Sequence, residues 1–108
     1  MSTPTVSAAP RPGIPADVLA VAREQGVEQY VSPLIEMARE VYPGAMQFEV
    51  FVEDDPEIAN DRHIVFRLTV ALGLPEAREA DRRWHEGVFR IVPAPLVGVF
   101  RLSADLRP

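Results

Sequence analysis

The sequence predicts an α+β domain of two layers, with elements in the order α-α-β-β-α-β and a three-stranded, mainly antiparallel sheet packed by helices. Residues 46–53 and 63–70 alternate between apolar and polar positions, as strands with one buried face do. Two stretches with helical spacing precede them, and a third leads to a final strand-like segment. Strands that are grouped, instead of alternating regularly with helices, favour this class over a doubly wound sheet.

Length and composition indicate one globular domain. The chain has 108 residues, of which 47% are hydrophobic and 25% charged, which is ordinary for a globular protein. Residues 1–13 are rich in proline and lack periodicity, so we expect a disordered N-terminal tail before a single domain at residues 14–108. No apolar run approaches the ~20 residues of a membrane helix. Without a secretory signal or any cysteine, we expect a cytoplasmic protein with no membrane contact.

The first two helices are predicted from turn signals and apolar spacing. Pro15 suits the first turn of a helix that ends at Gly26. Ser32 is expected to cap a second helix that has Pro33 at its first position. Residues 15–44 contain five acidic side chains but only two arginines. A DNA-reading helix pair needs more donors for bases and phosphates, so we interpret these helices as core elements.

The two strands are predicted to pair antiparallel, with Glu53 opposite His63. In this register three apolar pairs share one face: Phe48 with Leu68, Val50 with Phe66, and Val52 with Ile64. The other face carries Phe51 opposite Val65. Two alternatives remain open for that face: it is an uncovered apolar surface beside an open sheet edge, which invites another chain, or the N-terminal helices cover it.

A third helix is predicted to begin at Gly73-Leu74-Pro75. Its apolar positions recur at helical spacing and therefore share one face: Ala77, Ala80, Trp84, Val88 and Ile91. We expect Trp84 to anchor this helix on the sheet by packing against Phe48 and Phe66. Residues 96–103 are expected to form the third strand.

The densest group of polar side chains lies in the turn between the first two strands. Residues 46–72 contain six acidic side chains and two arginines, so most of the net charge of −5 is concentrated there. The turn has three interpretations: a solvated connection, a loop that recognises a partner, or a metal site. The candidate binding residues are Asp54, Asp55, Glu57, Asp61, His63, Phe51 and Val65.

Residue types that are missing exclude several chemistries. All 11 basic residues are arginine, so a phosphate-binding lysine and a Schiff base are impossible. No cysteine nucleophile, glycine-rich phosphate loop or histidine-rich metal site can be formed either. We therefore assign no catalytic residues and expect no cofactor. Because binding to phosphates depends on cations, the net acidic charge argues against nucleic acid as a partner, and we expect none.

The pattern D-P-E-I-x-x-D-R-H-I-V-F at residues 55–66 resembles an acidic hairpin in small uncharacterised bacterial proteins, and Trp84 and residues 99–103 fit the same resemblance. Proteins of this kind are often encoded beside a second small gene. The leading hypothesis is a non-enzymatic protein-interaction module, the acidic, antitoxin-like partner of an adjacent-gene protein, with a homodimer formed through an edge strand as a further possibility. The alternative is a metal-dependent hydrolase that uses the turn carboxylates and His63.

Overall fold

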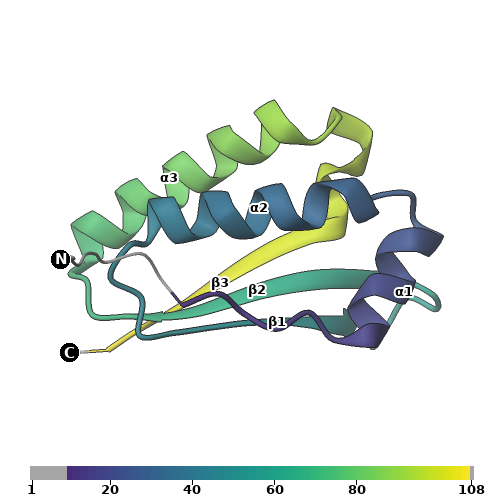
Figure 1. Cartoon of the computed structure of the whole chain (residues 1–108), viewed down its shortest axis with the longest axis horizontal. Coiled ribbons are helices and arrows are strands. Elements are labelled where there is room, and N and C mark those ends of the chain that lie inside the picture. Colours follow the sequence, from purple (N-terminus) through teal and green to yellow (C-terminus); the bar gives the residue numbers. More distant parts are fainter. Residues whose placement is uncertain (1–9, 108) are drawn as a thin grey trace, which may run out of the picture.

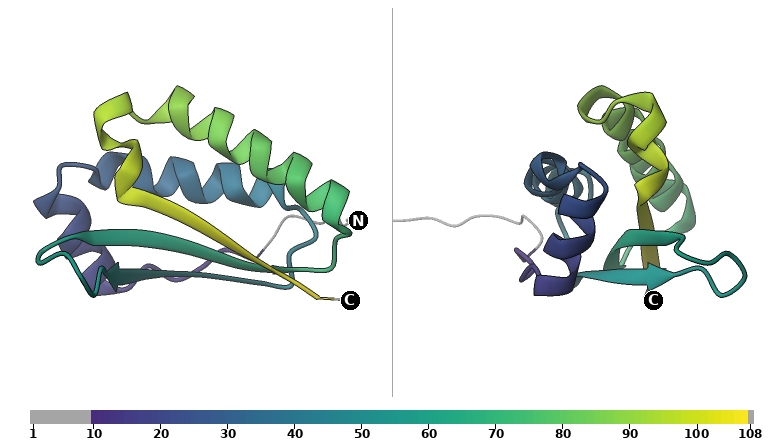
Figure 2. Two further views of the ribbon diagram at one scale, coloured as in Figure 1. Left: turned by 180° about the vertical axis from the view of Figure 1, so that it is seen from behind. Right: turned by 90° about the vertical axis from the view of Figure 1, so that its right-hand side faces the viewer.

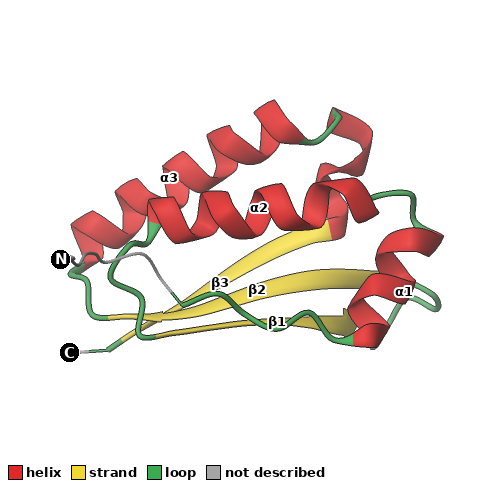
Figure 3. Cartoon of the chain, in the orientation of Figure 1, coloured by secondary structure: helices red, strands yellow, loops and turns green. Residues whose placement is uncertain are grey.

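The structure, a computed structural model, describes residues 10–107 and confirms the predicted α+β fold and the order of its elements. Residues 1–9 and 108 lie outside the described residues, and with them most of the predicted tail at residues 1–13. Helices form one layer and the sheet the other (Figure 3). The elements are α1 (Ala16–Glu24), α2 (Glu28–Val41), β1 (Gln47–Asp54), β2 (Arg62–Val70), α3 (Leu74–Ile91), the 3-10 helix η1 (Ala94–Val99) and β3 (Phe100–Leu106).

The sheet is mixed, with the strand order β1-β2-β3 (Figure 1). β1 and β2 pair antiparallel, whereas β2 and β3 pair parallel. The sequence predicts a mainly antiparallel sheet, and the parallel pair corrects that expectation. The physical reason is the connection: the 18 residues of α3 carry the chain back along the sheet, so that β3 starts at the same end as β2.

The predicted register of the hairpin is confirmed. Glu53 lies opposite His63, and the three apolar pairs face each other as expected. All three helices pack on the face that carries these pairs: α2 and α3 run side by side above the sheet, and α1 lies beside the β1–β2 turn (Figures 1 and 2). None of the helices in residues 10–107 combines the length and apolar character needed to cross a membrane.

The sheet face that bears Phe51 and Val65 points away from the helices, so the N-terminal helices do not cover it (Figure 2). Side chains of the sheet itself shield part of this face. The guanidinium carbon of Arg67 lies 4.8 Å from the centre of the Phe51 ring. Val65, on the central strand between Phe51 and Arg101, is only 5% exposed.

Two boundaries differ from the expected ones. α2 begins at Glu28 and includes Pro33, because Val27 and Val31 are buried and extend the apolar stripe toward the N-terminus. Pro33 lacks the N–H group that would otherwise donate to the carbonyl of Gln29 in the preceding turn. Both residues are exposed, so water can donate a hydrogen bond to this carbonyl instead. The segment expected to be a strand at residues 96–103 is helical as far as Val99, because the chain must first turn from α3 down to the sheet.

The core is centred on Phe66 of β2. Its ring centre lies 5.5 Å from that of Trp84 and 6.2 Å from that of Phe48, both in edge-to-face geometry. The ring of Phe100 stacks on it at 6.0 Å. The predicted anchoring of α3 by Trp84 is thus confirmed at Phe66, and Phe48 joins the cluster through the same ring.

Candidate acidic binding site

The turn between β1 and β2 has a defined shape that depends on Asp55. The Oδ1 atom of Asp55 accepts hydrogen bonds from the N–H groups of Glu57, at 2.8 Å, and of Ile58, at 3.1 Å. The N–H of Asp55 donates to the carbonyl of Asp61 at 2.8 Å. Asn60 has a φ of 65°, which asparagine tolerates better than most residues. Asp55 therefore holds the turn together, and its carboxylate is already engaged within the chain.

Two other predicted binding carboxylates also have partners. Asp54 Oδ1 lies 3.2 Å from Arg62 Nε, and Asp61 Oδ2 lies 3.1 Å from His63 Nε2. The other ring nitrogen of His63 lies 3.0 Å from the carbonyl oxygen of Gly98, in the segment before β3. His63 is 7% exposed, so its ring ties the turn to the η1–β3 junction.

Glu57 is the exception among the four predicted turn carboxylates. Its side chain is exposed and makes no hydrogen bond or ion pair with the described residues. It is therefore the carboxylate of the turn that is fully available to a partner.

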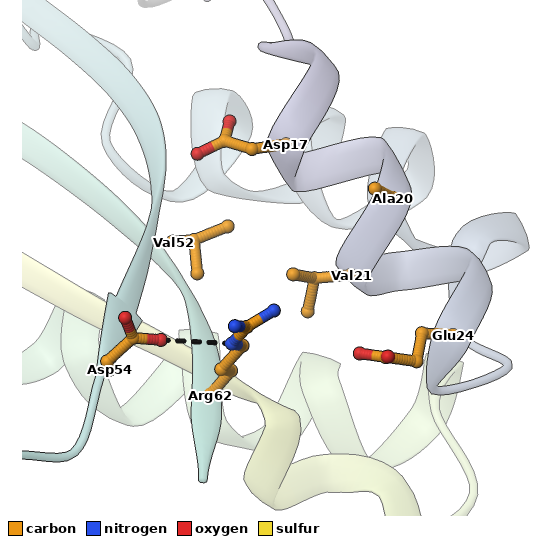
Figure 4. A pocket seen from close by; sticks show the side chains of 7 residues that line it. All are labelled: Asp17, Ala20, Val21, Glu24, Val52, Asp54 and Arg62. Carbon is orange, nitrogen blue, oxygen red and sulfur yellow. Dashed lines mark ion pairs between the residues drawn. The ribbon is translucent and has the colours of Figure 1, made fainter. Parts of the chain in front are cut away.

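A hollow of about 350 Å³ lies between α1 and the hairpin (Figure 4). α1 lines it with positions at spacings of three, one and three, which lie on one side of a helix. The lining residues are Asp17, Ala20, Val21 and Glu24 of α1, Val52 and Asp54 of β1, and Arg62 of β2. The ion pair between Arg62 and Asp54 spans its hairpin side (Figure 4).

A second hollow, of about 360 Å³, lies next to the first and shares Glu24 and Arg62 with it. The second hollow is also lined by Gln25, Asn60 and Asp61. Gln25 Nε2 donates to the carbonyl of Arg62 at 3.1 Å, which fixes the end of α1 against β2. We call the surface formed by these two hollows the acidic groove.

Charge in the acidic groove is unbalanced. Four carboxylates, those of Asp17, Glu24, Asp54 and Asp61, surround the single guanidinium of Arg62. Asp17 and Glu24 make no ion pair with any described residue. The groove thus presents uncompensated negative charge beside the apolar side chains of Val21 and Val52.

Two residues that line this groove, Asp54 and Asp61, are among the predicted binding residues, whereas the side of the groove on α1 was not predicted from the sequence. Asp17 and Glu24 are seven residues apart, a spacing that places them on one side of α1, but this signal does not say which element that side faces. The other predicted binding residues do not line the groove: Asp55, Glu57 and His63 belong to the turn and its base, and Phe51 and Val65 lie on the sheet face that points away from the helices. The candidate residues therefore divide between two surfaces.

Within residues 10–107, no three histidine, aspartate or glutamate side chains are arranged so that they could hold a metal ion. His63 and Asp61 form a pair, and each has its position fixed by the turn.

The chain matches no protein-family model, no curated protein and no solved structure. The acidic groove is a concave surface at which carboxylates without ion-pair partners among residues 10–107 lie beside apolar side chains.

Proposed function

We propose that the protein is a non-enzymatic interaction module that binds a basic protein partner through the acidic groove, as the acidic, antitoxin-like member of an adjacent-gene pair. One observation carries the proposal: α1 and the hairpin form a hollow in which Asp17 and Glu24 lack ion-pair partners among residues 10–107. The sequence pattern alone supports only an acidic turn, whereas the hollow adds a shape that a protruding side chain fits.

An arginine or lysine side chain of the partner matches both parts of this hollow. Its methylene stem packs against Val21 and Val52, and its cationic head reaches Asp17 or Glu24. Glu57, in the turn that supplies Asn60 and Asp61 to the groove, adds long-range attraction. Such complementarity raises the association rate more than the affinity, and salt screens it.

A matched pair of variants tests the proposal. The test variant carries Glu24→Gln and Glu57→Gln, and the control variant carries Glu40→Gln and Glu49→Gln. All four glutamates are exposed and have no ion-pair partner among the described residues, so both variants lose the same charge without breaking an internal contact. Each protein is used for affinity capture from a lysate of the native host, followed by mass spectrometry.

We expect wild type and control to retain a basic protein that the test variant loses. With that partner purified, stopped-flow measurements should give an association rate that falls with added salt for wild type and control, and a slower, less salt-sensitive rate for the test variant. Equal capture and equal rates for all three proteins would show that the groove is ordinary solvated surface.

A further inference from the structure

β3 is an edge strand whose outer side is open. In the described part of the chain it pairs with β2 alone, and in the view from behind no other described ribbon lies in front of it (Figure 2). Its seven residues contain no proline, the residue with which proteins commonly block an edge. The row of backbone N–H and C=O groups on this side is therefore available to another strand.

The sequence of β3 is complementary to itself. If two copies pair antiparallel about Ser103, Arg101 of each copy lies directly opposite Asp105 of the other. Both residues are on the face that points away from the helices, because they are in register with Val65 and Thr69 of β2. Both are exposed, and neither makes an ion pair with the described residues. Opposite charges that face each other across two strands stabilise their pairing.

The helix-facing side of β3 is complementary in size. In the same register Leu102 of each copy lies opposite Ala104 of the other, a large residue against a small one. A shallow hollow of about 240 Å³ opens at this point between β3 and α3. It is lined by Tyr42, Ala77, Arg78, Asp81, Leu102, Ala104 and Leu106. Leu102 of the second copy would stand at the mouth of this hollow.

The flank of α3 above β3 carries apolar side chains that a second copy would cover. Arg78 and Asp81, which line the hollow, share this flank with Leu74 and Phe89 at spacings of three to eight residues. Leu74 is 53% exposed and Phe89 is 60% exposed. Leu106, at the end of β3, is 40% exposed. Leu74, Phe89 and Leu106 are three of the five exposed large hydrophobic residues among residues 10–107.

We propose that the chain forms a two-fold symmetric dimer in which β3 pairs antiparallel with β3 of a second copy about Ser103, so that two sheets join into one. A closed two-fold interface of this kind uses the same patch of both subunits. It goes beyond the proposed function, because the acidic groove lies at another part of the molecule and stays open in each copy.

Cysteine cross-linking tests the register. The chain has no cysteine, so Ser103→Cys introduces a single thiol. In the proposed dimer the two copies of residue 103 are directly opposite, with Cα atoms about 4.5–5.5 Å apart, within the range that a disulfide spans. We expect mild oxidation to convert most of this variant into a covalent dimer. The matched variant Arg101→Cys places its thiols about 13 Å apart along the strands and should cross-link at least tenfold more slowly.

Charge exchange tests the ion pair with the rest of the chain intact. The single change Arg101→Asp, or Asp105→Arg, places like charges opposite each other at both of the symmetry-related 101–105 pairs. We therefore expect each single change to weaken the dimer at least tenfold in sedimentation equilibrium. The double variant with both changes restores opposite charges and should recover most of the wild-type affinity. A wild-type chain that is monomeric at millimolar concentration overturns the proposal. Equal cross-linking at positions 101 and 103, or a double variant as weak as the singles, overturns it as well.

Discussion

Met37 of α2 fills the space that the missing side chain of Gly87 leaves on α3: a Cβ atom at Gly87 would lie 1.8 Å from the sulfur of Met37. Glycine in the interior of a helix costs about 1 kcal/mol relative to alanine. Gly87 is nevertheless buried within α3, where it lets α2 and α3 approach closely. The packing of Met37 against Gly87 therefore offsets the low helix propensity of glycine at this position of α3.

The first prediction concerns this contact. Gly87→Ala in the wild-type background should bring no gain in the free energy of unfolding, because the new methyl group displaces Met37. In a Met37→Ala background the same change should stabilise the protein by about 1 kcal/mol, the helix propensity of alanine over glycine. Urea unfolding of the four proteins in this double-mutant cycle measures the difference. Equal effects in both backgrounds would contradict the contact.

The second prediction concerns the stability of the protein at alkaline pH. Burial, with a further effect from the Asp81 carboxylate, raises the pKa of Tyr42 from 10.0 to about 12. The unfolded chain loses the Tyr42 proton near pH 10, whereas the folded protein keeps it until about pH 12. The free energy of unfolding therefore has its full value below pH 10 and falls as the pH rises toward 12. The loss should reach about 2–3 kcal/mol, at 1.36 kcal/mol per pKa unit. Denaturant unfolding at neutral pH and across this range measures it.

Two variants separate Tyr42 from the rest of the chain. The hydroxyl of Tyr42 has no hydrogen-bond partner among the described residues. Tyr42→Phe should therefore be as stable as wild type or more stable at neutral pH, and should lose the part of the alkaline destabilisation that Tyr42 causes. Tyr30→Phe removes the only other phenol and should retain that part. A Tyr42→Phe protein that keeps the full alkaline loss would disprove this assignment.

The third prediction separates the structural from the available carboxylates of the turn. Asp55→Ala removes the acceptor for two backbone N–H groups and should cost about 1 kcal/mol of unfolding free energy. Asp55→Asn keeps an Oδ1 acceptor and should be nearly neutral, as should Glu57→Gln. Thermal unfolding of these three variants and of wild type measures the differences in stability. If Asp55→Ala were as stable as Asp55→Asn, the hydrogen bonds of Asp55 would not define the turn.

The fourth prediction concerns the aromatic cluster. Trp84 is 2% exposed and contacts Phe66, so Trp84→Ala should cost about 3–5 kcal/mol. Phe89→Ala on the same helix, where the ring is 60% exposed, should change stability by about 0.5 kcal/mol or less in dilute solution. Equilibrium unfolding in urea checks both. A small cost for Trp84→Ala would remove this residue from the core.

The sequence was sufficient to predict the pairing of β1 with β2, but not the position and direction of β3 in the sheet. The alternation of Phe48, Val50 and Val52 with polar residues determines which face is buried, and pairing within a hairpin is local, so the register could be read directly. The position and direction of β3 depend on how α3 packs across the sheet, and no pattern within residues 96–103 records that packing. The start of α2 at Glu28 could not be predicted for a similar reason. Pro33 indicates a later start, and only the tertiary burial of Val27 and Val31 shows that the helix begins before it.

The same limit applies to the candidate site. Acidic residues of the turn stand out in the sequence, but Asp55 and Asp61 prove to be structural acceptors. The unpaired carboxylates of Asp17 and Glu24 belong to a helix that looks like an ordinary core element. Only tertiary packing places them against the hairpin, which is why the groove could not be predicted.

The mixed sheet has a consequence for the order of folding. Asp54 meets Arg62 across a short turn, so β1 and β2 can associate early and with little loss of chain entropy. Ile64 meets Phe100 only after the whole of α3 has folded back between them. Until that happens, β2 is itself an unprotected edge with a highly apolar sequence. The interval before β3 docks is therefore when this chain is most exposed to aggregation, and variants that slow the docking of α3 should lower the yield of refolding more than they lower the equilibrium stability.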